Sequence, residues 1–272
     1  MFDEKSYSLK MDKAIEVFSK ELSSLRTGRA NASMLDLIKV DVYGQQMPIN
    51  QVGSITTPEP RMINIQVWDA NNVSLVDAAI QKSTTIFHIG SLSLIEGEDA
   101  SLWESKFQAL NHQGVITSLD PNARPVAVNN KAPYIERLKS MLQQTCVLKL
   151  SDEDLEYLVP DTPLQDAFAQ LCATSCAQLL ILTKGSDGAI VRTPSQQFEV
   201  SAVEADPLRD TVGAGDTFMG TILVELYRRS LNAQDIAHLP LKELQKILER
   251  AATAAAINCQ SSGCADINTD TG

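Results

Sequence analysis

The sequence lacks the features by which membrane and secreted proteins are recognised. None of its apolar runs approaches the roughly 20 residues that a helix needs to cross a bilayer, so no membrane span is predicted. The N-terminal stretch, MFDEKSYSLKMDKAIEVFSK, is charged throughout and has no apolar segment ahead of a small-residue cleavage site, so it does not predict a secretory signal. We therefore expect a soluble, cytoplasmic protein without membrane partners.

Histidine and cysteine are scarce, which limits the kinds of metal site that the chain could build. The three histidines are scattered, and neither cysteine pair, Cys172/Cys176 or Cys259/Cys264, has the C-x-x-C spacing with further ligands that zinc requires. Reduced structural cysteines are the favoured interpretation, with metal binding as the alternative. The five cysteines are Cys146, Cys172, Cys176, Cys259 and Cys264.

An excess of basic residues is also absent, since the net charge is -11. Residues 1–83 are almost balanced, and nearly all the excess acid lies after residue 83. Non-specific nucleic-acid binding needs a cationic surface that neutralises phosphates, so it is not expected of the second part. An ordinary enzyme is compatible with this charge.

Apolar residues near the N-terminus repeat with the period of a helix. Their spacing of 4, 3, 4 and 3 predicts a long helix over residues 3–27, which Gly28 would end. Such a narrow apolar stripe is typical of a helix that packs against partner helices. The stripe consists of Met11, Ile15, Phe18, Leu22 and Leu25.

After this helix the apolar period changes from 3.6 to 2, which predicts half-buried strands. Gly44, Pro48 and the Pro58-Glu59-Pro60 stretch supply turns between the strands, and a short helix over residues 73–82 closes the segment. The alternating apolar residues are Ile38, Val40 and Val42, then Ile63, Ile65 and Val67.

One long helix that leads into a small β module, with LRTGRANASMLDLIKVDVYG at the passage, resembles the ribosome recycling factor family. The resemblance continues through QQMPINQVGSITTPEPRMINIQVWDANNVSLVDAAIQKS and stops at Ser83. It implies that Arg26 and Arg29 lie near a hinge and a surface that contacts ribosomal RNA. A solvated helix end is the alternative. The family's other two helices do not follow, so recycling activity is not expected.

From residue 85 onward, apolar runs alternate with helical stretches. Strands that are apolar on both faces and separated by helices predict a parallel sheet with helices on either side. The fold class that we predict is therefore α/β. Ligands of such folds gather at the carboxyl ends of the strands, so the loops at that edge are the candidate positions for chemistry.

The stretch DTVGAGDTFMG, residues 210–220, carries the strongest chemical signal. Its glycines permit a tight turn, and a helix that starts near Gly215 would direct unpaired amides at an anion. Asp216 would lie in the positive potential of that helix end and could accept a proton from a hydroxyl. The alternative is that Asp216 only stabilises the helix dipole.

This motif resembles the signature of the ribokinase/PfkB carbohydrate kinases, and FHIGSLSL, SLDPNARP, VLKLSDEDLEYL and LTKGSDGA resemble the fructokinases among them. The resemblance covers residues 84–272 and implies a ribokinase-like sheet. It also implies that Asp216 is the base that activates a sugar hydroxyl. The backbone of Gly213, Ala214 and Gly215 would form the anion hole.

The resemblance implies further contacts to the nucleotide and to cations. Thr183, Gly185 and Asn258 would contact ATP, and Asp210 and Thr211 would hold a monovalent cation. Ser151 and Asp154 stand where the family often has an N-x-x-E motif for magnesium and phosphate, a departure that weakens a metal role. The turn at Asp120-Pro121-Asn122-Ala123-Arg124 either faces the site or is only structural.

The expected function is ATP-dependent and Mg²⁺-dependent phosphoryl transfer to a sugar, with fructose as the favoured acceptor. The chain would thus join an incomplete recycling-factor segment, residues 1–83, to an incomplete kinase segment, residues 84–272. The family's sugar contacts come from a first half that residues 1–83 replace, so a loss of activity is one expectation. Ribosome binding is one alternative. A fusion with neither activity is another, since no Gly/Ser/Pro-rich linker of the kind that separates fused domains lies between Lys82 and Thr85.

Overall fold

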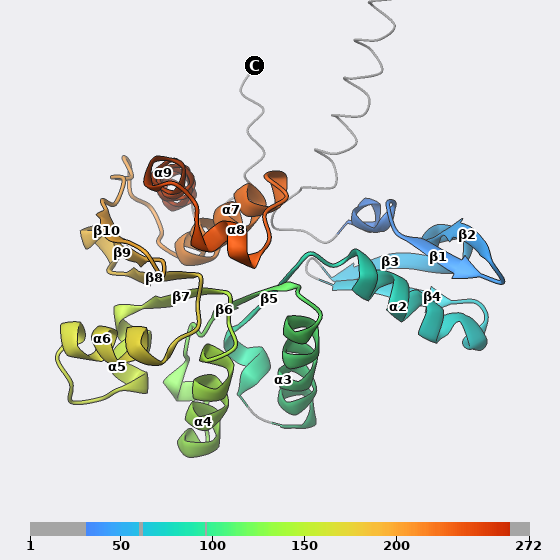
Figure 1. Cartoon of the computed structure of the whole chain (residues 1–272), viewed down its shortest axis with the longest axis horizontal. Coiled ribbons are helices and arrows are strands. Elements are labelled where there is room, and N and C mark those ends of the chain that lie inside the picture. The colour runs from blue at the N-terminus through green and yellow to red at the C-terminus, as the bar shows by residue number, and fades with distance from the viewer. Residues whose placement is uncertain (1–30, 60–61, 96, 262–272) are drawn as a thin grey trace, which may run out of the picture. The chain divides into compact units, whose positions relative to one another are not determined.

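The computed structural model describes residues 31–59, 62–95 and 97–261. These residues form two compact units, which divide between Ser83 and Thr84 (Figure 1). The long helix expected over residues 3–27 lies outside the described residues, as do Arg26 and Arg29.

The described residues of the smaller unit, 31–59 and 62–83, form two separate antiparallel strand pairs and one α-helix, with short 3-10 turns between them. Tyr43 and Gly44, both with positive φ, make the tight turn of the first hairpin, as two-residue turns between twisted strands require. The elements are β1 (Lys39–Val42) paired with β2 (Gln45–Pro48), β3 (Gly53–Glu59) paired with β4 (Met62–Val67), and α2 (Val73–Ser83).

A small apolar core holds this unit together. Val40 from β1 and Ile49 after β2 are fully buried, and Val76 of α2 packs into the same cluster. Burial alternates along β1, so the period-2 pattern of the sequence is confirmed there.

The larger unit is built on a six-stranded sheet with the order β10-β9-β8-β7-β6-β5. Neighbours from β5 to β8 pair in parallel, whereas β9 pairs antiparallel with both β8 and β10. The strands are β5 (Ile86–Gly90), β6 (Ile116–Asp120), β7 (Val147–Ser151), β8 (Leu179–Thr183), β9 (Ala189–Arg192) and β10 (Gln197–Val200). The sequence predicted only parallel strands, so the hairpin of β9 and β10 is an addition. These strands pair antiparallel because the connections between them are too short to cross over between parallel strands.

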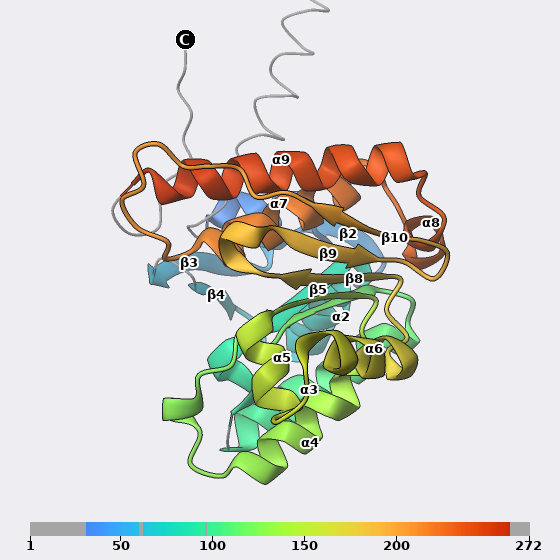
Figure 2. The same ribbon diagram turned by 90° about the vertical axis from the view of Figure 1, so that its left-hand side faces the viewer.

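Helices cover both faces of this sheet, and the predicted α/β class with a ribokinase-like sheet is confirmed (Figures 1 and 2). Residues along β8 alternate between two cores: Leu179 and Ile181 pack with α7 and α9, while Leu180 and Leu182 pack toward α3, α4 and α6. One face carries α3 (Gly97–His112), α4 (Lys131–Leu142), α5 (Asp152–Leu158) and α6 (Leu164–Thr174), and the other α7 (Ala214–Arg228), α8 (Ala233–Ala237) and α9 (Leu241–Cys259).

Burial on both faces explains why these strands read as continuous apolar runs in the sequence. All five residues of β6 are buried, as are the first four of β7 and of β8. Within the described part of the chain, no helix is both long and apolar enough to span a membrane.

Candidate active site

A glycine turn leads directly into α7. Gly213 adopts the left-handed conformation, with φ of 78°, and serves as the N-cap. The Ala214 amide donates to the Thr211 carbonyl at 3.2 Å, and the Thr217 amide makes the first helical bond, to the Gly213 carbonyl, at 2.8 Å. The amides of Gly215 and Asp216 lie between these two and have no acceptor within the helix. This end of the helix carries partial positive charge.

The C-terminal end of α9 holds the turn in place. The Asn258 side-chain amide donates to the Val212 carbonyl at 2.8 Å, and Asn258 is only 1% exposed. The Cys259 carbonyl accepts from the backbone amides of Arg209 and Asp210 at 2.8 and 3.2 Å. Asn258 was predicted to contact the nucleotide; in the structure it braces the loop before α7, and its nucleotide contact stays a prediction.

The Asp216 side chain lies exposed in the first turn of α7. Exposure leaves the carboxylate accessible to a ligand, and its position also suits stabilisation of the helix dipole, so both interpretations of the sequence remain compatible with the geometry. Asp210 is partly engaged, because its Oδ1 accepts from the Val212 amide at 3.0 Å, and Thr211, which follows it, is exposed. Their monovalent-cation role stays a prediction.

Parallel strands bring several predicted residues to one edge of the sheet. Gly90, at the end of β5, pairs in register with Asp120, at the end of β6. A side chain at Gly90 could not fit, since its Cβ would lie 2.2 Å from the Asp120 carbonyl oxygen. Ser151 and Thr183 pair in the same way at the ends of β7 and β8.

Thr183 and Gly185 lie where β8 gives way to a short loop. The Thr183 hydroxyl donates to the Leu150 carbonyl at 3.3 Å, and Gly185 has a φ of 56° with open space beside it. The left-handed backbone accounts for the glycine. Contact of this loop with a nucleotide stays a prediction.

Ser151 and Asp154 form a capping box at the start of α5. The Asp154 amide donates to the Ser151 hydroxyl at 3.0 Å, while Asp154 Oδ2 accepts from the Ser151 amide at 2.9 Å. Asp154 Oδ1 accepts from the Ala123 amide at 2.6 Å and so ties the Asp120–Arg124 turn to the start of α5. Both carboxylate oxygens thus have structural tasks, which favours capping over the predicted magnesium role.

Sequence reasoning missed a buried ion pair at this edge. Lys149, in the middle of β7, donates from Nζ to Asp120 Oδ2 at 2.6 Å, and the two side chains are only 6% and 4% exposed. Burial raises the pKa of Asp120 against the opposing effect of the Lys149 ammonium. The available signal was a lysine inside the otherwise apolar strand VLKLS, for which burial demands a charged partner.

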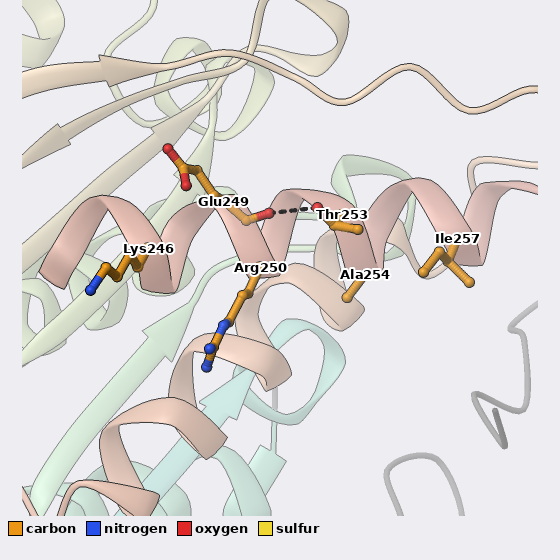
Figure 3. Close-up of a pocket in the computed structure, with 6 residues that line it drawn as sticks. All are labelled: Lys246, Glu249, Arg250, Thr253, Ala254 and Ile257. Atoms are coloured by element: carbon orange, nitrogen blue, oxygen red, sulfur yellow. Dashed lines mark hydrogen bonds between the residues drawn. The ribbon is translucent and has the colours of Figure 1, made fainter. Parts of the chain in front are cut away.

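Two hollows lie elsewhere on the larger unit. One, of about 350 Å³, runs along α9 and is lined by Lys246, Glu249, Arg250, Thr253, Ala254 and Ile257 (Figure 3). The other, of about 630 Å³, lies between α6 and strands β8 to β10 and includes Phe168, Cys172 and Arg192. Neither is lined by the glycine turn or by Asp216.

An α/β sheet with a glycine turn and a helix start beside its strand ends is typical of a class of nucleotide- and phosphate-binding proteins. Within this class the family is specific, because the model of the pfkB family carbohydrate kinases matches residues 32–271. The chain therefore belongs to the pfkB family of carbohydrate kinases.

Solved structures of similar fold include several kinases. A fructokinase with bound ATP from Xylella fastidiosa is 25% identical, with a TM-score of 0.63, over 77% of this chain and 67% of that one. A Vibrio cholerae fructokinase double mutant bound to fructose, ADP and potassium is 25% identical, with a TM-score of 0.58, over 66% of this chain and 56% of that one. An aminoimidazole riboside kinase from Salmonella enterica, 24% identical over 65% of this chain and 57% of that one, has a TM-score of 0.58 and supports the fold alone.

Curated relatives of a different kind match a shorter part of the chain. A ribosome-recycling factor from Maricaulis maris is 52% identical over 97 residues, which is 36% of this chain and 50% of the relative. One from Sphingopyxis alaskensis is 50% identical over 82 residues, 30% of this chain and 45% of the relative. The chain spans about half the length of these relatives. The two sets of comparisons support a mixed origin for the sequence.

Proposed function

We propose that the larger unit transfers a phosphoryl group from ATP to a sugar hydroxyl, with fructose as the favoured acceptor. The observation that carries this proposal is the exposed Asp216 carboxylate beside the unpaired amides of the first turn of α7. Phosphoryl transfer to a hydroxyl requires a proton acceptor and a backbone that binds an anion. Family membership and kinases of similar fold support the same chemistry.

The proposed step divides its work between two groups. The Asp216 carboxylate takes the proton of the sugar hydroxyl while that oxygen bonds to the γ-phosphorus, and the bond between phosphorus and the departing ADP oxygen breaks. The sequence predicted an anion hole from the backbone of Gly213, Ala214 and Gly215. Because the Ala214 amide already donates to the Thr211 carbonyl, we assign the amides of Gly215 and Asp216 to the negative charge on the transferred group. Gly213 permits the left-handed turn that presents them.

Mg²⁺ would enter this reaction on the nucleotide. The described residues contain no cluster of three His, Cys, Asp or Glu side chains suited to hold a metal ion. Mg²⁺ commonly keeps several waters and binds through substrate phosphates with one or two carboxylates, so the site fits a metal that ATP brings. We also propose that Asp210 and Thr211 hold a monovalent cation.

A coupled assay of ADP release, with a panel of sugars that includes fructose, tests the proposal. We expect sugar-dependent ADP release by the full chain and a loss of about 100-fold or more in kcat for Asp216→Asn. Asp166→Asn is the matched control, because Asp166 is also an exposed aspartate in a first helical turn, that of α6. Failure of every sugar to stimulate ADP release would refute the activity.

We also infer a second candidate function, ribosome binding through residues 1–83, which the recycling-factor relatives favour. Arg26 and Arg29 are the predicted contacts, and both lie outside the described residues. Co-sedimentation of the full chain with ribosomes at low salt, weakened in Arg26→Ala and Arg29→Ala, would support it. Arg61→Ala, which alters a different basic residue of the same segment, serves as the control. A chain that stays in the supernatant at low salt would exclude this function.

A further inference from the structure

Lys149 is a lysine in a position where its neighbours are apolar. It is the third residue of β7, it is only 5% exposed, and Leu148 and Leu150 beside it are fully buried. Removing an ammonium group from water costs several kcal/mol, so a lysine in such a strand needs a strong compensating interaction.

That interaction is the bond to Asp120, and it leaves the site incompletely satisfied. Nζ of Lys149 lies 2.6 Å from Oδ2 of Asp120, but Asp120 Oδ1 is buried without a hydrogen-bond partner among the described residues. Stability does not explain the pair, because well-packed apolar residues of similar volume are often as stable as a buried ion pair. Buried charges of this kind are instead characteristic of functional sites.

The pair lies against the glycine turn of the proposed phosphate site. A Cβ built on Gly215 would lie 3.4 Å from Nζ of Lys149 and 3.8 Å from its Cε, so the ammonium packs on the side where Gly215 has no side chain. The Asp216 carboxylate is close enough for its charge to act on Asp120, as is that of Asp154. Lys149 thus places a positive charge among three carboxylates and under the first turn of α7.

We infer that the Lys149–Asp120 pair is a positioning element whose buried positive charge strengthens the hold of the α7 turn on the terminal phosphate of ATP. The inference rests on the proposed function. Lys149 acts through Gly215 and does not touch the nucleotide. The helix end supplies only about half a positive charge, and the pair adds a dipole whose positive end, the ammonium, lies against Gly215 in a medium that screens it weakly.

The neighbouring carboxylates explain why a positive charge would help phosphate binding at this position. ATP brings several negative charges to an edge of the sheet that already carries Asp120, Asp154 and Asp216. Without a buried cation, these carboxylates would repel the terminal phosphate. Asp120 is needed as well, because it holds the ammonium in place at 2.6 Å. No step of the transfer is routed through the pair.

The test compares ATP with ADP, because only ATP carries the terminal phosphate. Lys149→Met alone leaves a buried carboxylate without its partner, so the key variant is the double substitution Lys149→Met with Asp120→Asn, which removes both charges at nearly constant volume. By isothermal titration with MgATP and MgADP, we expect affinity for ATP to fall about tenfold in this variant, with affinity for ADP changed less than twofold.

The control is Glu104→Gln, which breaks an ion pair to Arg137 at 3.2 Å between α3 and α4 and should leave both affinities unchanged. If the double variant does not fold, Gly215→Ala supplies the second test. Its methyl group would make an ordinary contact with the ammonium and cover it, so ATP affinity should fall about threefold more than ADP affinity.

Equal losses for the two nucleotides would assign the pair a purely structural role and overturn the inference, as would unchanged ATP affinity. A wild-type chain that binds ATP but phosphorylates no sugar would refute the proposed function, while the ATP-to-ADP ratio would still decide the role of Lys149. A wild-type chain that does not bind ATP would refute both.

Discussion

The two units of the chain differ most in what they bury. The smaller unit encloses a single apolar cluster around Val40 and Ile49. The larger unit has a core on each face of its sheet, and it also contains every polar or charged residue that is buried in the described part of the chain. Buried polar groups cost stability unless they are paired, so their concentration in the larger unit makes that unit the place to look for a functional site.

Three of these buried groups, Asp120, Lys149 and Asp154, belong to two neighbouring strands and the helix that follows them. They hold the loops at the carboxyl edge of the sheet, where the glycine turn begins α7. The smaller unit offers no comparable set among its described residues. The comparison teaches that a catalytic role is to be sought in the larger unit.

The difference between the two units is tested most strongly by substitutions that damage each core separately. Ile181→Ala and Ile49→Ala each empty a fully buried site, and each should lower the free energy of unfolding of its own unit by about 2–5 kcal/mol. Only Ile181→Ala should weaken ATP binding. The chain has two tryptophans, Trp68 in the smaller unit and Trp103 in the larger, so single-tryptophan variants report each unit in urea.

If Ile49→Ala shifted the Trp103 transition as far as the Trp68 transition, the two units would unfold as one. The two cores would then not stabilise their units independently.

Asp154→Ala should give the next largest effect, in the larger unit alone. It removes the capping box of α5 and leaves the Ala123 amide without its acceptor, so we expect a loss of about 2 kcal/mol at the Trp103 transition. Glu153→Ala, an exposed neighbour in the same helical turn, is the control. Equal effects of the two substitutions would argue against a bracing role for Asp154.

Gly44→Ala should act on the smaller unit and cost about 1 kcal/mol. Gly44 has a φ of 81° in the turn between β1 and β2, a conformation that alanine adopts only with strain. The Trp68 transition should move to lower urea concentration and the Trp103 transition should stay. Gly220→Ala is a useful contrast, because that glycine has open space and ordinary helical backbone in α7. A loss at Gly220 as large as that at Gly44 would contradict this explanation.

The smallest expected effect concerns acid stability of the larger unit. Burial alone would raise the pKa of Glu225, but hydrogen bonds and charge from Arg229, with the charge of Arg250, hold that pKa below its ordinary value of 4.5. A lowered folded-state pKa contributes stability above the unfolded value, and this stability is lost as the pH falls through the folded one. Wild type should therefore lose its advantage over Glu225→Gln below about pH 4.5, measured at the Trp103 transition. An advantage that stays constant however far the pH falls below 4.5 would contradict this account.

Much of the fold could be predicted from the sequence because its strands and helices have distinct apolar periods. Strands such as VLKLS and LLILT read as buried on both faces, and the alternation in β1 and β4 gave the strands of the smaller unit. The antiparallel β9 and β10 escaped prediction, since short strands beside a turn give no signal of their direction. The division between Ser83 and Thr84 is visible in the structure as two compact units.

The candidate site was predictable only in part. The glycine turn and Asp216 are contiguous in sequence, so a motif could identify them. The Lys149–Asp120 pair joins residues 29 positions apart, and the Asn258 bond to Val212 joins residues 46 apart. Such contacts depend on strand order and helix packing, which one sequence does not specify. The structural tasks of Asn258 and Asp154 were hidden for the same reason.

Phosphorus NMR of the full chain with MgATP and fructose tests the central claim most directly. The account predicts that the γ-phosphate signal of ATP falls as a sugar-phosphate signal rises with wild type and with Asp166→Asn, and that neither changes with Asp216→Asn. Persistence of the ATP signal with wild type, or an equal rate with Asp216→Asn, would contradict it.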